Sequence, residues 1–193
     1  MPRKKQQSDE ALLEALMPAI FSKGPREFTL AEAAGAAGLS AATLIQRFGS
    51  KQGLVVAALE LTNRRNFAAL DNLPPEKGAK AVIRIFVERT PAPEHEHLLS
   101  DQLLWLRESM ADPEINAVSR NYFVKFRRTI AERMPPLGIP ADEAALLVEA
   151  QWHGAMTQWG IGRDGHLRGY VERSLYNWFE LAGCGTATVT GSG

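Results

Sequence analysis

The chain has little of what stabilises secreted proteins or crosses membranes. Of its 193 residues only Cys184 is a cysteine, so no disulfide can form within one chain. No apolar run approaches the roughly 20 residues that a membrane-spanning helix needs. The first residues are charged and lack the apolar stretch of a secretion signal. We therefore expect a cytoplasmic protein.

Motifs of common enzymes are also absent. The sequence contains no phosphate-binding glycine loop and no nucleophile elbow. Residues 94–97, Glu-His-Glu-His, are of types that bind metals, but no third His or Cys stands nearby. A solvated helix start explains this segment better, because acidic side chains suit the N-terminal end of a helix. We expect no enzyme activity, no cofactor and no metal.

Charge is balanced over the whole chain and unequal along it. The 22 Lys and Arg residues match 22 Asp and Glu residues. Residues 1–65 hold nine basic against six acidic residues, a net charge of +3, which leaves thirteen basic and sixteen acidic residues, −3, for the remainder. A mildly basic head on an acidic body suits a protein that meets phosphates with one end only.

The spacing of apolar residues and prolines predicts an all-α protein of about nine helices and no strand. Proline separates most of the helices, because a helix interior rejects it. Pro18 is the exception, and it predicts either a kink in the first helix or a later start. The expected helices span residues 8–23, 29–36, 40–47, 50–71, 76–90, 94–111, 114–134, 141–161 and 166–182. In the seventh, a stripe at steps of three and four contains Ile115, Val118, Tyr122, Phe126 and Ile130.

The most informative segment begins at Phe28 and reads FTLAEAAGAAGLSAATLIQRFGSK. Thr29 and Glu32 have the spacing of a capping box, which starts a helix. Gly38 can adopt the left-handed conformation that ends this helix, and Ser40 can cap the next one. Two short helices joined by a tight turn predict a helix-turn-helix, whose second helix enters the DNA major groove.

The second short helix has two distinct faces. Leu44 and Phe48, four residues apart, are expected to point inward. Thr43, Gln46 and Arg47 share another face, at positions i, i+3 and i+4. Gln and Arg are the residue types that read adenine and guanine edges, and Thr can serve either. This face is therefore the candidate for reading base pairs.

These residues resemble the signature of the TetR family of bacterial transcriptional repressors. The resemblance is close over about residues 10–60, and its core is the run AGLSAATLIQRFGSKQGL that starts at Ala37. The sequence departs from the family at Ala42, where Gly is frequent, at Ile45, where Tyr is usual, and at Arg47, where Tyr or His is usual. The family's Tyr commonly touches a phosphate, so Ile45 is not given that role. The matching positions are Thr29, Ala37, Gly38, Ser40, Thr43, Leu44, Phe48, Lys51 and Leu54.

The resemblance implies a transcriptional regulator, more specifically a repressor that binds a palindromic operator as a homodimer and leaves it when a small, largely apolar ligand binds. The alternative is a helical ligand-binding protein, or an enzyme, whose head no longer binds DNA. The expected DNA-binding residues are Thr29, Ser40, Ala41, Thr43, Gln46, Arg47 and Lys51.

The same resemblance predicts the layout of the chain. Residues 1–55 form the DNA-binding domain, helix 50–71 links it to a ligand-binding and dimerisation domain over residues 72–183, and residues 184–193 form a disordered tail. The candidate ligand-lining residues are Phe86, Leu103, Trp105, Phe123, Trp152, Met156 and Trp159. The candidate dimer-interface residues are Trp152, Ala155, Tyr170, Leu175, Trp178 and Phe179.

Overall fold

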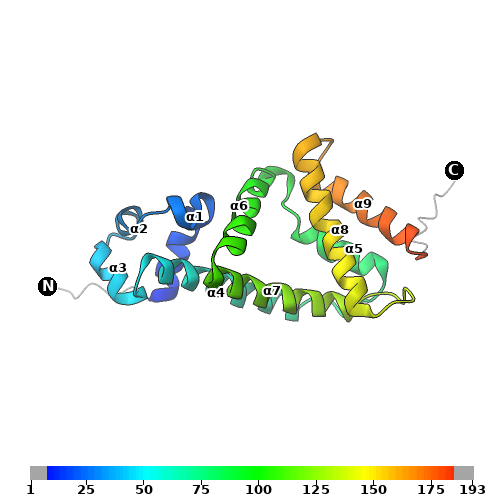
Figure 1. Ribbon diagram of the computed structural model, residues 1–193, viewed down its shortest axis with the longest axis horizontal. Helices are drawn as coiled ribbons and strands as arrows, with labels where there is room; N and C mark the ends of the chain where they lie inside the picture. The colour runs from blue at the N-terminus through cyan, green and yellow to red at the C-terminus, as the bar shows by residue number, and fades with distance from the viewer. Residues whose placement is uncertain (1–7, 185–193) are drawn as a thin grey trace. The chain divides into compact units, whose positions relative to one another are not determined.

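The computed structural model describes residues 8–184 and confirms an all-α fold over that range (Figure 1). The described part of the chain contains nine α-helices and one short 3₁₀ helix, with no strand. None of these helices has both the length and the apolarity that a bilayer crossing demands. The predicted disordered tail, Cys184 excepted, lies outside the described residues. The elements are α1 (Asp9–Glu27), α2 (Leu30–Ala37), α3 (Ala41–Phe48), α4 (Lys51–Asp71), α5 (Ala79–Arg89), η1 (Pro93–His95), α6 (Leu98–Ala111), α7 (Pro113–Ala131), α8 (Ala141–Gly162) and α9 (Leu167–Leu181).

The described residues form two compact units. The first, called the head unit below, contains α1 to α4 together with residues 100–122, which are most of α6 and the first half of α7. The second, called the body unit, contains residues 72–99 and the chain from Phe123 onward. Residues 100–122 therefore group with the head, whereas the sequence-based division placed them in the body. The predicted domain limits remain a prediction.

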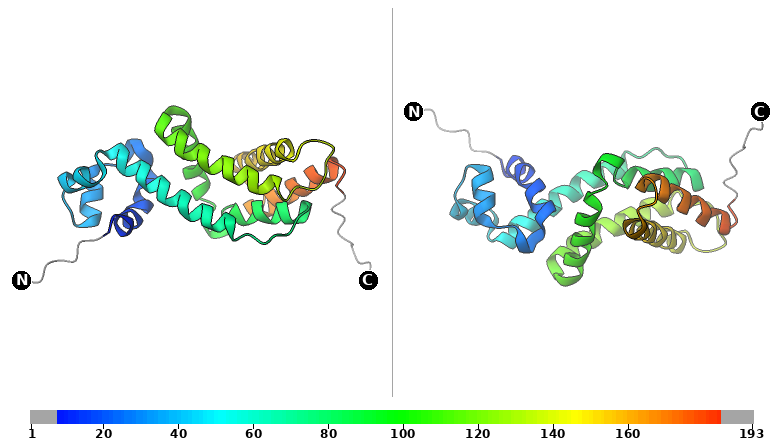
Figure 2. Two further views of the ribbon diagram at one scale, coloured as in Figure 1. Left: turned by 90° about the horizontal axis from the view of Figure 1, so that it is seen from below. Right: turned by 90° about the horizontal axis from the view of Figure 1, so that it is seen from above.

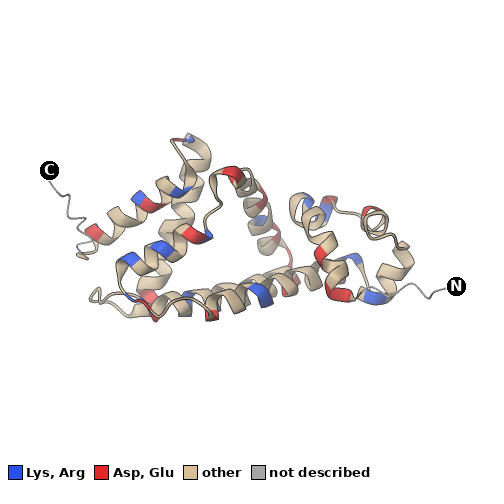
Figure 3. Cartoon of the chain, turned by 180° about the vertical axis from the view of Figure 1, so that it is seen from behind, with Lys and Arg blue, Asp and Glu red and all other residues tan. Residues whose placement is uncertain are grey.

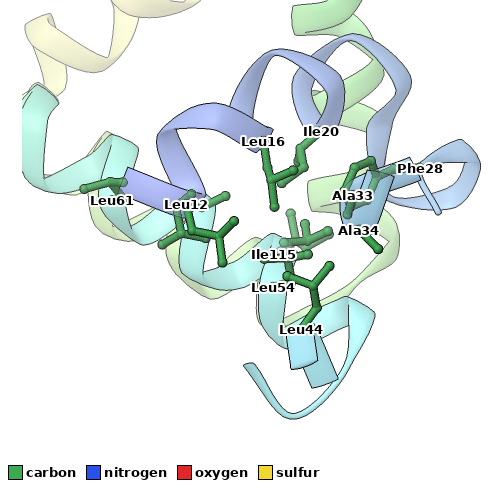
Figure 4. Packing of buried hydrophobic residues seen from close by; sticks show 13 residues of the cluster. Leu12, Leu16, Ile20, Phe28, Ala33, Ala34, Leu44, Leu54, Leu61 and Ile115 are labelled. Atoms are coloured by element: carbon green, nitrogen blue, oxygen red, sulfur yellow. The ribbon is translucent and has the colours of Figure 1, made fainter. Parts of the chain in front are cut away.

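The head unit is built around one apolar core, in which side chains from α1, α2, α3, α4 and α7 point toward one another (Figure 4). Leu44 is its fully buried contribution from α3, as predicted. Burying each large aliphatic side chain contributes about 1.5–3 kcal/mol, so this core fixes α1, α2 and α3 against α4. Its main members are Leu12, Leu16, Ile20, Phe28, Ala33, Ala34, Leu44, Leu54, Leu61 and Ile115.

The first helix runs through Pro18 and is interrupted at Gly24 instead. Gly24 has φ 71° and ψ 170°, a conformation that is essentially restricted to glycine. Neither a kink at Pro18 nor a later start was the right prediction, because α1 begins at Asp9 and its non-helical residue is Gly24. Pro18 is tolerated because it lies on the exposed side, with Glu14, whose carbonyl it leaves without a helical partner.

Helix α6 is attached to this break in α1. Pro25 has no N–H to offer the carbonyl of Phe21, and the indole N–H of Trp105 donates to that carbonyl instead, at 2.9 Å. The rings of Phe21 and Trp105 lie 5.2 Å apart. Arg26 donates to the buried carboxylate of Glu108 at 3.2 Å. The break in α1 thus creates the docking point for α6.

In the body unit, α8 and α9 lie side by side, and α5 packs against α9 (Figure 2). The predicted helix 94–111 was wrong at its start. Residues Pro93–His95 form a 3₁₀ turn, and α6 begins only at Leu98. Glu96 lies in the connection, where its carboxylate accepts the backbone N–H of Leu167 at 2.8 Å and so caps α9.

We expect Gly24→Ala to destabilise the protein by about 1–3 kcal/mol, because a Cβ makes this backbone conformation unfavourable. The added Cβ would also lie 2.8 Å from a methyl group of Leu104. Urea denaturation measures the change. Gly35→Ala is the matched control, because Gly35 lies inside α2, where an added Cβ would meet no atom within 4 Å, and Ala there favours the helix by up to about 1 kcal/mol. Equal stability of the two variants would contradict the conclusion that the backbone conformation at residue 24 requires glycine.

Candidate functional site

The two short helices of the predicted motif begin and end as the sequence predicts. The Thr29 hydroxyl accepts the backbone N–H of Glu32 at 3.2 Å, and the Glu32 carboxylate accepts that of Thr29 at 3.1 Å. Lys23, which pairs with Glu32, lowers the pKa of that carboxyl below its ordinary value, and the hydrogen bonds from Thr29 act in the same direction. Gly38 adopts the left-handed conformation, with φ 62°. The capping box and the turn are therefore confirmed.

The start of α3 is held by two hydroxyl groups. Ser40 Oγ accepts the backbone N–H of Thr43 at 3.1 Å and lies 2.8 Å from the Thr43 hydroxyl. Ser40 is exposed, while Ala41 and Thr43 are half-buried. Of these three candidate DNA-binding residues, Ser40 therefore presents the most surface, and Thr43 is largely occupied in shaping the helix start.

The surface of α3 divides differently from the sequence-based expectation. Leu44 is buried and Phe48 is partly buried against the head core. The exposed residues of the helix are Ala42, Ile45 and Gln46. Gln46 is thus the one member of the predicted reading face that is exposed.

Arg47 is turned toward the start of α1. Its Nε donates to the carboxylate of Asp9 at 2.6 Å, and its side chain is only 17% exposed. The guanidinium predicted to read guanine therefore lies in an ion pair in this structure. Sequence reasoning missed Asp9, because 38 residues separate the partners and no local pattern connects them.

Most positive charge described in the head is paired with acids. Blue and red segments lie next to each other on the helices of the head (Figure 3). Lys51, a candidate phosphate contact, gives one of its three N–H groups to the carbonyl of Phe28, at 3.2 Å. The ion pairs of the head include Lys23–Glu32, Arg26–Glu108, Arg47–Asp9, Arg65–Glu14 and Arg107–Glu108.

Five of the seven candidate ligand-lining residues lie in the body unit. The ring of Phe86 is 5.3 Å from that of Trp152, whose indole N–H donates to the hydroxyl of Thr90 at 2.9 Å. Leu103 and Trp105 belong to the head unit, where Trp105 is engaged with Phe21. The five residues of the body unit are Phe86, Phe123, Trp152, Met156 and Trp159.

His153 lies beside this aromatic group. Its ring is 4.8 Å from that of Trp152 and 5.7 Å from that of Phe123. Burial lowers the pKa of His153 below its ordinary value, against the opposing effect of Glu149. Glu149 is itself held by Arg127, at 2.9 Å. His153 is therefore held mainly neutral near pH 7, able both to donate and to accept a hydrogen bond.

The candidate dimer residues divide into buried and accessible ones. Four of them are only 0–8% exposed within their own chain and therefore offer almost no surface to a partner subunit in this structure: Trp152, Ala155, Leu175 and Phe179. Tyr170 and Trp178 are half-buried on α9. The large exposed apolar residues of α8 are different ones, which sequence periodicity alone did not separate: Leu146, Leu147 and Ile161.

The Glu-His-Glu-His segment does not gather into a metal site. His95 pairs with its neighbour Glu94 at 3.8 Å, and Glu96 lies 3.6 Å from His166. Across residues 8–184 no group of three His, Cys, Asp or Glu side chains is placed to hold a metal ion.

Comparison with known proteins shows a family match for the head and structural relatives for the whole fold. Residues 12–58 match the model of the bacterial regulatory proteins of the tetR family. No curated protein matches the chain. A transcriptional regulator from Saccharomonospora viridis, solved in complex with choline, shares 22% identity and a TM-score of 0.69, over 89% of this chain and 95% of that one.

Two further solved structures have the same fold. A TetR-family regulator from Rhodococcus sp. shares 19% identity and a TM-score of 0.66, over 90% of this chain and 97% of that one. FadR from Bacillus subtilis, solved with stearoyl-CoA, shares 12% identity and a TM-score of 0.64, over 91% and 98% of the two chains. The matched residues, whose helix-turn-helix is confirmed in space, form a head of the kind found in bacterial regulatory proteins of the tetR family, and the solved structures share the all-α fold of the chain.

Proposed function

We propose that the protein is a cytoplasmic repressor that binds a palindromic operator as a homodimer and releases it when a small, largely apolar ligand binds. The observation that carries the proposal is the outer face of α3. It remains exposed around Gln46 while the opposite face is sealed in the head core. A short second helix of a helix-turn-helix with one free face is what the major groove admits.

We expect residues at the N-terminal ends of helices to contact the DNA backbone. Thr29 and Ser40 are exposed at the N-terminal ends of α2 and α3, where a phosphate is favoured by the helix dipole. Lys51 opens α4 and retains N–H groups beyond the one bound to Phe28. Because most other cations of the head are paired, we expect these few contacts and dimerisation to supply the affinity.

The exposed face of α8 supports a homodimer. It carries a seam at alternating steps of three and four residues, the spacing of helices that pack along their length. Small residues in its middle allow close approach of a second helix, and larger aliphatic residues stand at both ends. The seam consists of Leu147, Ala150, Gly154, Thr157 and Ile161. A two-fold dimer would let two copies of α3 reach half-sites about 34–36 Å apart.

The aromatic group of the body unit supports a small-molecule ligand. Aromatic and Met side chains favour an apolar ligand, and the neutral His153 can orient one polar group. Two structural relatives were solved with organic molecules, choline and stearoyl-CoA, which supports ligand binding by this fold but leaves the apolar character to the residues of the body unit. Helix α6 would carry the signal, because it enters the head unit and is fastened to α1 through Trp105 and Glu108.

We expect that the protein selects one palindromic motif from a pool of random duplex DNA at a defined salt concentration. Gln46→Ala should weaken binding to it by about tenfold or more and relax the preference at one base pair, because an amide reads adenine by two hydrogen bonds. Fluorescence anisotropy measures the affinity. The matched control is Gln102→Ala, an exposed glutamine on α6, which should bind like the parent. Weak, salt-sensitive and sequence-blind binding by the parent would instead favour a helical ligand-binding protein whose head no longer binds DNA.

Asp9→Asn should tighten DNA binding and make it more salt-dependent, with a slope steeper by about one, because the charge of Arg47 is then no longer neutralised by the Asp9 carboxylate. Stability should change by less than about 1 kcal/mol, as for other ion pairs near a surface. Binding isotherms at several salt concentrations measure both quantities. Glu10→Gln removes the same charge one residue away while leaving the Arg47–Asp9 pair intact, and it should change the slope less. Equal effects of the two substitutions would show that only overall charge matters.

The double substitution Leu147→Glu/Ile161→Glu should convert the dimer to a folded monomer, because it places charges at both ends of the α8 seam. Sedimentation velocity measures the oligomeric state, and circular dichroism verifies the fold. Val124→Glu, at a side chain 56% exposed on α7, is the control and should leave the dimer intact. A double variant that stays dimeric would place the interface elsewhere.

A further inference from the structure

The outward surface of α3 is mostly apolar. Ile45 is 45% exposed and is the one exposed large apolar side chain among the described residues of α1 to α4. Ala42 lies one turn before it on the same side, and Gln46 is its exposed neighbour. The surface available to a DNA groove therefore offers one amide and two methyl-bearing side chains.

Ile45 has no part in closing the head core. The core takes Leu44 in full and Phe48 in part, and both point away from the exposed side of α3. A single exposed isoleucine is common on protein surfaces and by itself means little. What makes this one informative is its place in the middle of the helix that faces DNA, beside the exposed amide.

The other polar candidate of this helix is engaged elsewhere. Arg47, the only cation of α3, is bound to Asp9 and largely buried, so it does not add a guanine-reading group to the outward surface. Thr43 is half-buried and its hydroxyl lies 2.8 Å from Ser40. Base reading is thus left to Gln46 and to the apolar groups of Ile45 and Ala42.

These groups match the chemistry of an A·T base pair. The amide of a glutamine can bind adenine at N6 and N7, and an apolar side chain contacts the C5-methyl group of thymine. We infer that α3 reads an A·T-containing step in each half-site, with Gln46 on an adenine and Ile45 packed against a thymine methyl group. The inference rests on the proposed operator binding and adds to it the base class that the helix selects.

The contact also gives Ile45 a role different from that of a hydrogen-bonding residue. It would contribute through the burial of apolar surface, which does not depend on released counterions. Loss of the contact should therefore lower affinity for the operator while leaving the salt dependence unchanged. This independence of salt distinguishes the Ile45 contact from the contacts that Thr29, Ser40 and Lys51 are expected to make with DNA phosphates.

The test uses the selected operator with its thymines replaced one position at a time by deoxyuridine. This change removes the methyl group and leaves the base-pairing groups in place. We expect one thymine in each half-site at which the change lowers the affinity of the full-length protein roughly fourfold per half-site, the effect of exposing one methyl-sized group. Anisotropy titrations with parent and variant proteins measure it.

Ile45→Ala should bind the thymine operator less tightly and should no longer distinguish thymine from uracil at that position. Ile45→Val, which keeps a branched apolar side chain, should retain most of the distinction. Leu106→Ala, which shortens a side chain 44% exposed on α6, is the control and should behave like the parent. Since Ile45 is exposed, all of these variants are expected to keep the parent's thermal stability.

Two results would overturn the inference while leaving the proposed function in place. One is a specific operator at which no uracil substitution weakens binding. The other is an Ile45→Ala protein that still distinguishes thymine from uracil at the sensitive position. Failure of the parent to select any motif would instead remove the proposed operator binding itself.

Discussion

The break near the end of α1 is the constraint on which the arrangement of the head unit depends. Gly24 leaves the helical conformation and Pro25 cannot donate, so the carbonyl of Phe21 is left for a partner from outside the helix. Trp105 supplies that partner from a position 84 residues further along the chain. A carbonyl without a hydrogen bond in this half-buried place would be destabilising. The hydrogen bond that Trp105 donates to it therefore holds α6 against α1.

The short helix α3 shows how few residues must serve several purposes at once. Leu44 anchors it to the core, Arg47 ties its last turn to Asp9, and Ser40 fixes its first turn. What is left outward is a narrow surface around Gln46. In the proposed complex, a helix of eight residues would read DNA with two or three side chains, and Ile45 and Arg47, which depart from the family signature, would change the chemistry available for that reading.

The body unit keeps several of its aromatic side chains inside and a different set of residues outside. Trp152 and Phe179 fill the space between helices, whereas the outward side of α8 carries small and aliphatic residues. A subunit interface and a ligand site would therefore use different faces of the same helix. Ligand binding among the aromatic residues would then shift the position of α8. Because both faces belong to the same helix, the face that a partner subunit touches would shift with it.

The sequence by itself determined the local structure. Capping residues, glycines and apolar spacing placed the helix-turn-helix and the all-α fold correctly, because caps and periodicity depend on residues within one or two turns of each other. The partner of Arg47, the attachment of Trp105 and the burial of Ala155 depended on contacts across 38 residues or more, or on which side of a helix faces a neighbour. The stripe of α7 makes the difference plain: the spacing placed Ile115 and Phe126 on one apolar face, but only the tertiary structure decided that Ile115 packs with the head while Phe126 lies in the body. Periodicity reports that a face is apolar, and only the packing of distant segments decides what covers it.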